Sequence, residues 1–482
     1  MSKAGTTPRR RTLRALLALG AAMGVALAGP VEAQQIRTLN DALALTYATN
    51  PALLAARAQL RVVDENVPQA LAGWRPTVTV TANAGYIDGT TQQYIRPTAI
   101  TPGRTLESQS LRGTNVQSLT VSQPLFRGGA TTATVNFREN QVLAQRATLI
   151  GAEQTAFTNA VQAYVGVIQA QQVLALTINN EQVLSRQLQA TRERFRVGEI
   201  TRTDVAQAEA ALAGAVANRQ TAEGDLQVAR SSFQQVIGEP APDRLVEPQP
   251  LRLPTRTLDE ARGLAGSNNP TVVAATFTDA AARDNFDVQY ARLMPNLTLQ
   301  GSLSRNEDVQ TKDITTKVGQ ILMVLSVPLY QGGAEYAAIR QARQDQQRTR
   351  QQVDDARRTA IQQVTEAWNR YAAARATIES TRQQIRSNEI ALEGVQREAI
   401  VGSRTTLDVL NEEQRLLNSR VTLVRNLGSL ITASYGVAAA GGRLTARDLN
   451  LNVPLYDETA YYRAVRNRLI GTGDQATDQP GR

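Results

Sequence analysis

The sequence predicts an α+β membrane protein with an internal duplication, in which four amphipathic β-strands per chain are continued by very long coiled-coil helices. Three observations lead to this fold class. The two halves of the 482-residue chain align with one another. Each half contains segments in which apolar and polar residues alternate with a period of two, and each also contains a long proline-free stretch with helical periodicity.

The N-terminus has the pattern of a secretory signal peptide. Arg9, Arg10, Arg11 and Arg14 precede an apolar stretch from Ala15 to Ala28, and Val31-Glu32-Ala33 fits a small-residue cleavage rule. A membrane anchor is the alternative, but the apolar run is shorter than the roughly 20 residues that span a bilayer. We therefore expect residues 1–33 to be removed.

Composition excludes most catalytic chemistry. The chain has no histidine and no cysteine, which removes imidazole bases, thiol nucleophiles, zinc-thiolate sites and disulfides. Its carboxylates are scattered along helix faces and form no paired acid and base. The net charge is +9, but the arginines beyond residue 14 are interspersed with acidic residues, so nucleic-acid binding is not expected. We predict no enzyme activity, no cofactor and no metal site.

The duplication organises the chain into two structural repeats. Asn50-Pro51 matches Asn269-Pro270 at an offset of 219 residues, and Val197-Gly198 matches Val401-Gly402 at an offset of 204. The offset falls because the first copy has a longer loop after its first strand. Each repeat reads as helix, strand, loop, strand, very long helix, tight turn and long helix. The predicted ranges are 34–247 for the first repeat, 248–449 for the second, and 450–482 for a C-terminal segment with a disordered tail.

The strand segments have one apolar and one polar face. Strands are predicted near 76–86, 115–126, 295–304 and 318–330, and Thr77 to Ala84 alternates strictly. Four strands cannot close a membrane barrel, and lipid tolerates no open sheet edge, so several chains would have to pool their strands. A soluble two-sheet sandwich predicts the same alternation, and the strands alone do not separate the two.

The helices favour the membrane assembly. Helix pairs are predicted over 129–237 and 333–440, and their first helices contain no proline, so each would run for roughly 100 Å. Apolar residues recur at helical or heptad spacing, which indicates packing along the whole length. The residues are Phe157, Val161, Val165 and Ile168 in one helix, and Leu410, Leu417, Val424 and Ile431 in another.

Each strand leads into its long helix through a Pro-Leu-aromatic-x-Gly-Gly motif. Proline ends donation to the strand ladder, and the glycines let the backbone turn. Phe126 and Tyr330 in these motifs suit either an aromatic girdle at a membrane interface or ordinary packing at a corner. The junction residues are Pro124, Gly128 and Gly129, then Pro328, Gly332 and Gly333.

The segment Val327 to Gly333, together with the paired turns 194–198 and 400–410, resembles the TolC family of outer-membrane efflux proteins. The similarity runs from about Thr38 to Leu449. It implies a homotrimer with a shared twelve-stranded barrel in outer-membrane lipid and an α-helical tunnel in the periplasm of a Gram-negative cell. It also implies docking to a periplasmic adaptor protein and an inner-membrane RND or ABC transporter, with drugs, other small molecules or unfolded proteins as cargo.

The resemblance also assigns a gate at the helical turns. It implies that Arg404 bonds to Thr203 and Asp204 on a neighbouring helix, which holds the pore closed, and that Asp408 rings the entrance. Asn411 stands where the family has a second aspartate, and Ala399 where some members have a latching tyrosine, so a weaker gate is expected. Helix capping is the alternative for Asp204 and Asp408.

The exposed turns are the predicted contact with the adaptor. Their residues are Val197, Gly198, Val401 and Gly402. The alternative is that the glycines serve only the turn geometry. The rival to the channel as a whole is a periplasmic coiled-coil scaffold without channel activity, and its difficulty is the four amphipathic strands.

Overall fold

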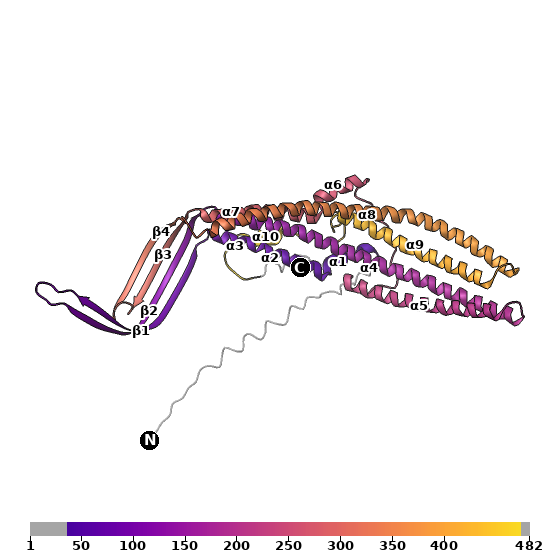
Figure 1. Cartoon of the computed structure of the whole chain (residues 1–482), viewed down its shortest axis with the longest axis horizontal. Helices are drawn as coiled ribbons and strands as arrows, with labels where there is room; N and C mark the ends of the chain where they lie inside the picture. Colours follow the sequence, from indigo (N-terminus) through magenta and orange to yellow (C-terminus); the bar gives the residue numbers. More distant parts are fainter. Residues whose placement is uncertain (1–35, 474–482) are drawn as a thin grey trace, which may run out of the picture.

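The computed structural model describes residues 36–473, which form an elongated molecule with a β-sheet at one end and two helical hairpins at the other (Figure 1). The predicted signal peptide and the residues 474–482 of the predicted disordered tail lie outside the described range. The two halves of the chain repeat one order of elements. The first half contains α1 Leu39–Thr49, α2 Pro51–Asp64, α3 Asn66–Leu71, η1 Ala72–Trp74, β1 Thr77–Ile95, β2 Arg104–Arg127, α4 Ala130–Arg196 and α5 Arg202–Ile237. The second contains α6 Leu258–Asn268, α7 Pro270–Tyr290, η2 Ala291–Leu293, β3 Asn296–Glu307, β4 Thr315–Ser326, α8 Ala334–Ile400 and α9 Thr406–Ala440, and α10 Ala460–Val465 follows.

The single helix predicted before each first strand is broken at an Asn-Pro pair. Proline disfavours helical geometry in the residue before it but suits the first helical position. Asn50 accordingly ends α1 and caps α2, its side chain accepting hydrogen bonds from the amides of Ala52 and Leu53. Asn269 does the same between α6 and α7. The sequence contained this signal, and both breaks follow from it.

The four strands form one antiparallel sheet in the order β1-β2-β3-β4. The longer loop predicted between the strands near 76–86 and 115–126 is wrong, because most of it is strand: β1 and β2 stay paired out to Ile95 and Arg104. β3 pairs with β2 only as far as Asn115, so residues 86–113 project beyond the sheet as a two-stranded hairpin. This part is rich in Gly, Thr and Gln and lacks the apolar alternation by which a half-buried strand is recognised.

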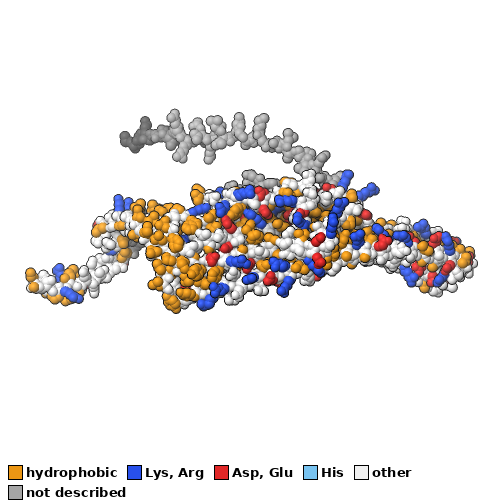
Figure 2. All heavy atoms as spheres, turned by 90° about the horizontal axis from the view of Figure 1, so that it is seen from above, with side chains coloured by type: hydrophobic (Ala, Val, Ile, Leu, Met, Phe, Trp, Pro, Cys, Tyr) orange, Lys and Arg blue, Asp and Glu red, His pale blue; other side chains and the backbone are white. Residues whose placement is uncertain are grey.

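One face of the sheet is a continuous apolar surface. The register places Val80 opposite Leu119 and Leu119 opposite Leu303, and one step along Val78 lies opposite Val121. Ile321, Met323 and Leu325 continue this face on β4. These side chains are largely exposed, as with Val80 at 74% and Ile321 at 79%. Figure 2 shows hydrophobic side chains gathered over the sheet end, whereas charged ones cover the helices.

The long helices α4 and α8 have 67 residues each, which corresponds to about 100 Å. α4 packs along α5, α7 and α9, and α8 packs along α7 and α9. The main core lies midway along the molecule, where α1, α2, α5, α9 and the C-terminal segment meet α4. Phe157, Val161, Val165 and Ile168 are buried in it, which confirms their predicted role. Leu410 and Leu417 are buried on α9, also as predicted.

The C-terminal segment crosses back over the first repeat. The amide of Tyr456 donates to Tyr47 Oη at 3.0 Å, and Tyr461 Oη donates to Glu65 at 2.8 Å. Nearer the sheet, Arg75 donates to the carbonyl of Arg468 at 2.9 Å. The segment therefore fastens α1, α2 and the start of β1 to one another.

Candidate functional site

The two helical hairpins end in turns with the same backbone geometry. The amides of Gly198 and Glu199 donate to the carbonyls of Phe195 and Arg194, and Gly198 has φ +84°. In the second hairpin, Gly402 and Ser403 donate to Ala399 and Glu398 in the same way, with φ +82° at Gly402. Glycine is thus needed at both positions for the left-handed conformation. The valines beside them are exposed, Val197 at 72% and Val401 at 78%.

Helix caps follow both turns. Thr201 and Asp204 form a capping box at the start of α5, and Thr405 and Asp408 form its equivalent on α9. Hydrogen bonds from Thr201 lower the pKa of Asp204, and those from Thr405 lower the pKa of Asp408, so both carboxylates are ionised at neutral pH. Both aspartates therefore cap the helices that follow the turns, as the capping alternative predicted. It leaves their outward oxygens free to meet a second partner.

Arg404 has a partner that the sequence did not suggest. Its Nε donates to Glu398 Oε2 at 2.9 Å across the α8–α9 turn, and this ion pair raises the pKa of Arg404. Within the described part of one chain, Arg404 does not bond to Thr203 or Asp204. Thr203 and Asn411 are exposed, whereas Ala399 is buried. A bond from Arg404 to another copy of the chain remains a prediction.

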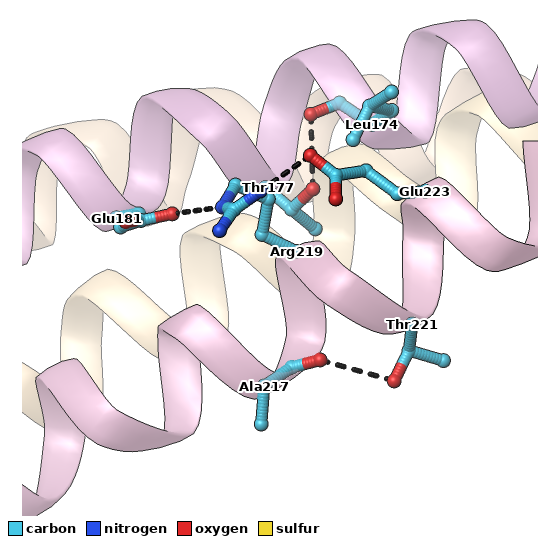
Figure 3. A network of polar contacts seen from close by, with 7 residues as sticks. All are labelled: Leu174, Thr177, Glu181, Ala217, Arg219, Thr221 and Glu223. Carbon is cyan, nitrogen blue, oxygen red and sulfur yellow. Dashed lines mark hydrogen bonds and ion pairs between the residues drawn. The ribbon is translucent and has the colours of Figure 1, made fainter.

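Polar contacts tie the two helices of each hairpin together, but at different positions. Arg219 on α5 lies between Glu181 of α4, at 2.6 Å, and Glu223 of α5 (Figure 3). Nearer the turn, Arg192 pairs with Glu209 at 2.6 Å. The second hairpin replaces the latter pair by a 3.3 Å hydrogen bond from Gln396 to Glu413. Apolar Ile385 and Leu423 stand at the positions that match Glu181 and Arg219. The α8–α9 hairpin has its own cross-links elsewhere: Arg420 of α9 pairs with Glu389 of α8 at 2.7 Å, and Asn388 donates to Ser419 at 2.9 Å.

The junction glycines adopt positive φ in both repeats, at Gly128, Gly129, Gly332 and Gly333. Gly129 and Gly333 stand at the N-caps of α4 and α8. The prolines differ from one another. Pro328 follows β4, but Pro124 lies inside β2 at a bulge, and the ladder continues to Arg127. Pro124 therefore donates no hydrogen bond but does not end the ladder, because it lies at a bulge where the pairing register shifts.

The aromatic residues of the junction motif are exposed, Phe126 at 49% and Tyr330 at 77%. Packing at the corner therefore does not account for Tyr330.

Among residues 36–473, no cluster of three or more acidic side chains has the arrangement of a metal site.

Comparison with known proteins gives a consistent answer. The sequence model of the family described as "Outer membrane efflux protein" matches residues 42–239 and 262–443. The chain is 34% identical to the outer membrane efflux protein BepC of Brucella suis biovar 1, over 93% of this chain and 96% of that protein. It is 24% identical to the outer membrane protein TolC of Escherichia coli K12, over 89% and 86% of the two chains.

A solved structure gives the same fold. The outer membrane protein VceC from Vibrio cholerae superimposes with a TM-score of 0.70 at 20% identity, over 84% of this chain and 96% of that one. The family match spans both repeats and the relative BepC spans nearly the whole chain. The chain therefore belongs to the outer membrane efflux protein family, and it is an outer-membrane protein of the TolC type.

Proposed function

We propose that three copies of this chain form an exit duct that carries cargo from an inner-membrane transporter and a periplasmic adaptor across the outer membrane. The proposal rests mainly on the sheet, which has an exposed apolar face and two unpaired edge strands, β1 and β4. Lipid can cover the face but cannot satisfy the edges, so β4 of one copy would pair with β1 of the next. Three copies give a closed barrel of twelve strands.

The helices supply the rest of the duct. Below the barrel, the α4 and α8 helices of three copies would enclose a tunnel about 100 Å long. A coiled-coil scaffold in the periplasm would need the helices but leave the apolar face of the sheet without a partner. Separation of outer-membrane and soluble fractions tests this directly: recovery of the mature protein in the soluble fraction would exclude the duct.

We infer that Arg404 holds the tunnel closed by reaching Thr203 and Asp204 of a neighbouring copy. The turn of the α8–α9 hairpin carries Arg404, so outward movement of this hairpin would break the bond. For Arg404→Ser we expect the single-channel conductance to rise about twofold or more, since a charge-assisted hydrogen bond of roughly 1.5–3 kcal/mol is lost in each copy. Planar-bilayer recordings of the purified mature protein measure this.

Glu398→Gln is the matched control. It removes the partner of Arg404 within the same turn and leaves Arg404 able to reach a neighbour. We expect its conductance to stay close to that of the parent. Equal opening in both variants would show that Arg404 acts only on its own turn, and unchanged current in Arg404→Ser would contradict the latch.

We also propose that the two turns dock the adaptor. A bulky residue at Gly402 would block this contact, and no atom lies within 4 Å of the place where its Cβ would stand. For Gly402→Trp we expect adaptor crosslinking and efflux-dependent drug resistance to fall at least about tenfold, the loss that 1.4 kcal/mol of contact energy gives. Gly402→Asn separates bulk from turn geometry, because asparagine tolerates positive φ. Loss in Gly402→Trp with retention in Gly402→Asn would support the docking contact, and retention in both variants would contradict it.

A further inference from the structure

The apolar face of the sheet ends at the junctions between strands and helices. On β4, Ile321 and Leu325 are followed by Val327 and Leu329, which are also exposed, Leu329 at 87%. The stretch from Gly319 to Leu329 spans about 25 Å along a barrel axis, at about 3.3 Å per residue and a strand tilt of roughly 40°. This height equals the apolar band of a membrane barrel, which is about 25 Å tall. The lower edge of the band therefore lies near Leu329.

The same level is marked at the start of β1 by Trp74 and Arg75. Leu125 of β2 matches Leu329 in the duplication, and Gln123 beside it donates to the Trp74 carbonyl at 2.9 Å. Trp74 is 41% exposed, and Arg75 follows it just before β1 begins. Tryptophan and arginine both suit the edge of a bilayer, where an apolar body stays in lipid and a polar end reaches the headgroups. The start of β1 thus lies at the lower edge of the apolar band.

The C-terminal segment reaches this level. Arg75 donates to the carbonyl of Arg468 at 2.9 Å. Arg468 in turn folds the backbone that follows it, because its Nε donates to the Ile470 carbonyl at 3.2 Å and its Nη1 to the Gly473 carbonyl at 2.9 Å. Leu469 and Ile470 are 73% and 88% exposed. Hydrogen bonds therefore hold two adjacent large apolar side chains outward at the edge of the band.

The surroundings of Leu469 and Ile470 fit a lipid surface. Arg468 and Arg75 lie beside them, and Arg127 at the end of β2 reaches Gly73 at the same junction. Apolar side chains flanked by arginines are typical of segments that lie in a membrane interface, where acyl chains take up the apolar groups and phosphates attract the cations. Residues 474–482 contain no large apolar side chain, so they offer no apolar surface to cover the pair.

We propose that residues 466–470 dock onto the periplasmic leaflet of the outer membrane, with Leu469 and Ile470 at the boundary between headgroups and acyl chains and Arg468 among the phospholipid phosphates. This inference rests on the proposed duct, in which the sheet spans the outer membrane. The segment forms an added layer over α2 and α4. Three such layers inside a duct would obstruct it, so the segment faces outward. Each copy then contacts the membrane twice, through its sheet and through its C-terminal segment.

Single introduced thiols test this contact, because the chain contains no cysteine. Ile470→Cys is coupled to the fluorophore nitrobenzoxadiazole, and the protein is placed in phospholipid nanodiscs. A nitroxide on the lipid headgroup, or near the end of the acyl chain, quenches a label that lies at its depth, whereas iodide quenches a label in water. For Ile470→Cys we expect the headgroup nitroxide to quench at least about threefold more strongly than the acyl-chain nitroxide or iodide.

Leu455→Cys is the matched control. Leu455 belongs to the same C-terminal segment and is also apolar and exposed, at 42%. The amide of the residue that follows it donates to Tyr47, whose ring packs against Phe157 of α4, about 40 Å along that helix from its start at Ala130. We expect iodide alone to quench its label. Ile321→Cys, on the apolar face of β4, is the opposite reference, and the acyl-chain nitroxide should quench it most.

The other outcomes separate the inference from the function on which it rests. Quenching of Ile470→Cys by iodide alone would place the segment in water, and protection from all three quenchers would mean that a neighbouring copy covers it. Equal headgroup quenching at Leu455→Cys would show that the label itself seeks lipid. Each of these results overturns the lipid contact, while lipid quenching at Ile321→Cys leaves the duct standing. Failure of both lipid nitroxides to quench Ile321→Cys would contradict the duct itself.

Discussion

Gly128→Ala is expected to destabilise the folded chain by about 3 kcal/mol or more. Gly128 has φ +60°, a conformation that costs an L-residue roughly 1–2 kcal/mol. An added Cβ would also overlap the Met294 side chain and come within 2.9 Å of the Ala291 carbonyl oxygen. Both atoms belong to the corner at which α7 and η2 lead into β3, so relief of the overlap would move the second repeat away from the first. Overpacking of this kind costs about 1–3 kcal/mol.

The duplication supplies the matched control. Gly332 occupies the same position of the second repeat with φ +66°, but no atom lies within 4 Å of its added Cβ. Gly332→Ala should therefore show only the conformational cost of about 1–2 kcal/mol. Thermal unfolding of the two variants in detergent, followed by the helical circular dichroism signal, measures the difference. Equal losses in both would mean that the contact with Met294 and Ala291 carries no stability.

Sequence reasoning reached most of the architecture because the long helices and the alternating strands have strong periodic signals. The break in each early helix at Asn50-Pro51 and Asn269-Pro270 was readable from the same residues by capping chemistry. The hairpin at 86–113 could not be predicted from the sequence in this way. It is exposed on both faces, so no burial imposes alternation on its residues, and its many glycines and threonines resemble a loop.

At the hairpin tips, the sequence identified the turns and the caps but not the partner of Arg404. Glu398 lies six residues before Arg404, and their contact depends on how the glycine at 402 turns the chain. This separation matches neither the helical nor the strand periodicity, so a search for periodic patterns does not identify the pair. The proposed gate would join two copies, and one chain contains only half of such a contact.

The cluster beneath the C-terminal segment also escaped sequence reasoning. Arg57 is almost completely buried, donates to the Tyr47 carbonyl at 3.0 Å, and lies against the rings of Tyr47 and Tyr456. Asp64, two turns further along α2, is completely buried, and neither of its carboxylate oxygens accepts a hydrogen bond. In the sequence both residues look like exposed charges of an amphipathic helix. Residues distant in the sequence surround them, including Tyr456 of the C-terminal segment, which lies against Arg57.

Burial raises the pKa of Asp64 from 3.8 to about 7, against the lowering effect of Arg146 and Arg61 and with the raising effect of Glu65 and Glu458. The folded chain then holds this proton more tightly than the unfolded chain does. Between about pH 4 and pH 7, the contribution of Asp64 to stability therefore falls as pH rises. This rise in the pKa of Asp64 corresponds to a loss of unfolding free energy of at most about 4 kcal/mol, which is complete above pH 7.

Asp64→Asn keeps the neutral shape of the protonated carboxyl at every pH. We expect its unfolding free energy to match that of the parent near pH 4.5 and to exceed it by about 2–4 kcal/mol at pH 8. Asp279→Asn is the contrasting variant, because Asp279 is also buried but accepts from Thr349 at 3.1 Å and pairs with Arg283. Its replacement should destabilise the chain at both pH values. Thermal unfolding of the three proteins across pH 4.5–8 measures these differences. A lower stability of Asp64→Asn at pH 8 would contradict the prediction. It would mean that the Asp64 carboxylate is ionised and paired with Arg146 or Arg61 beneath the C-terminal segment.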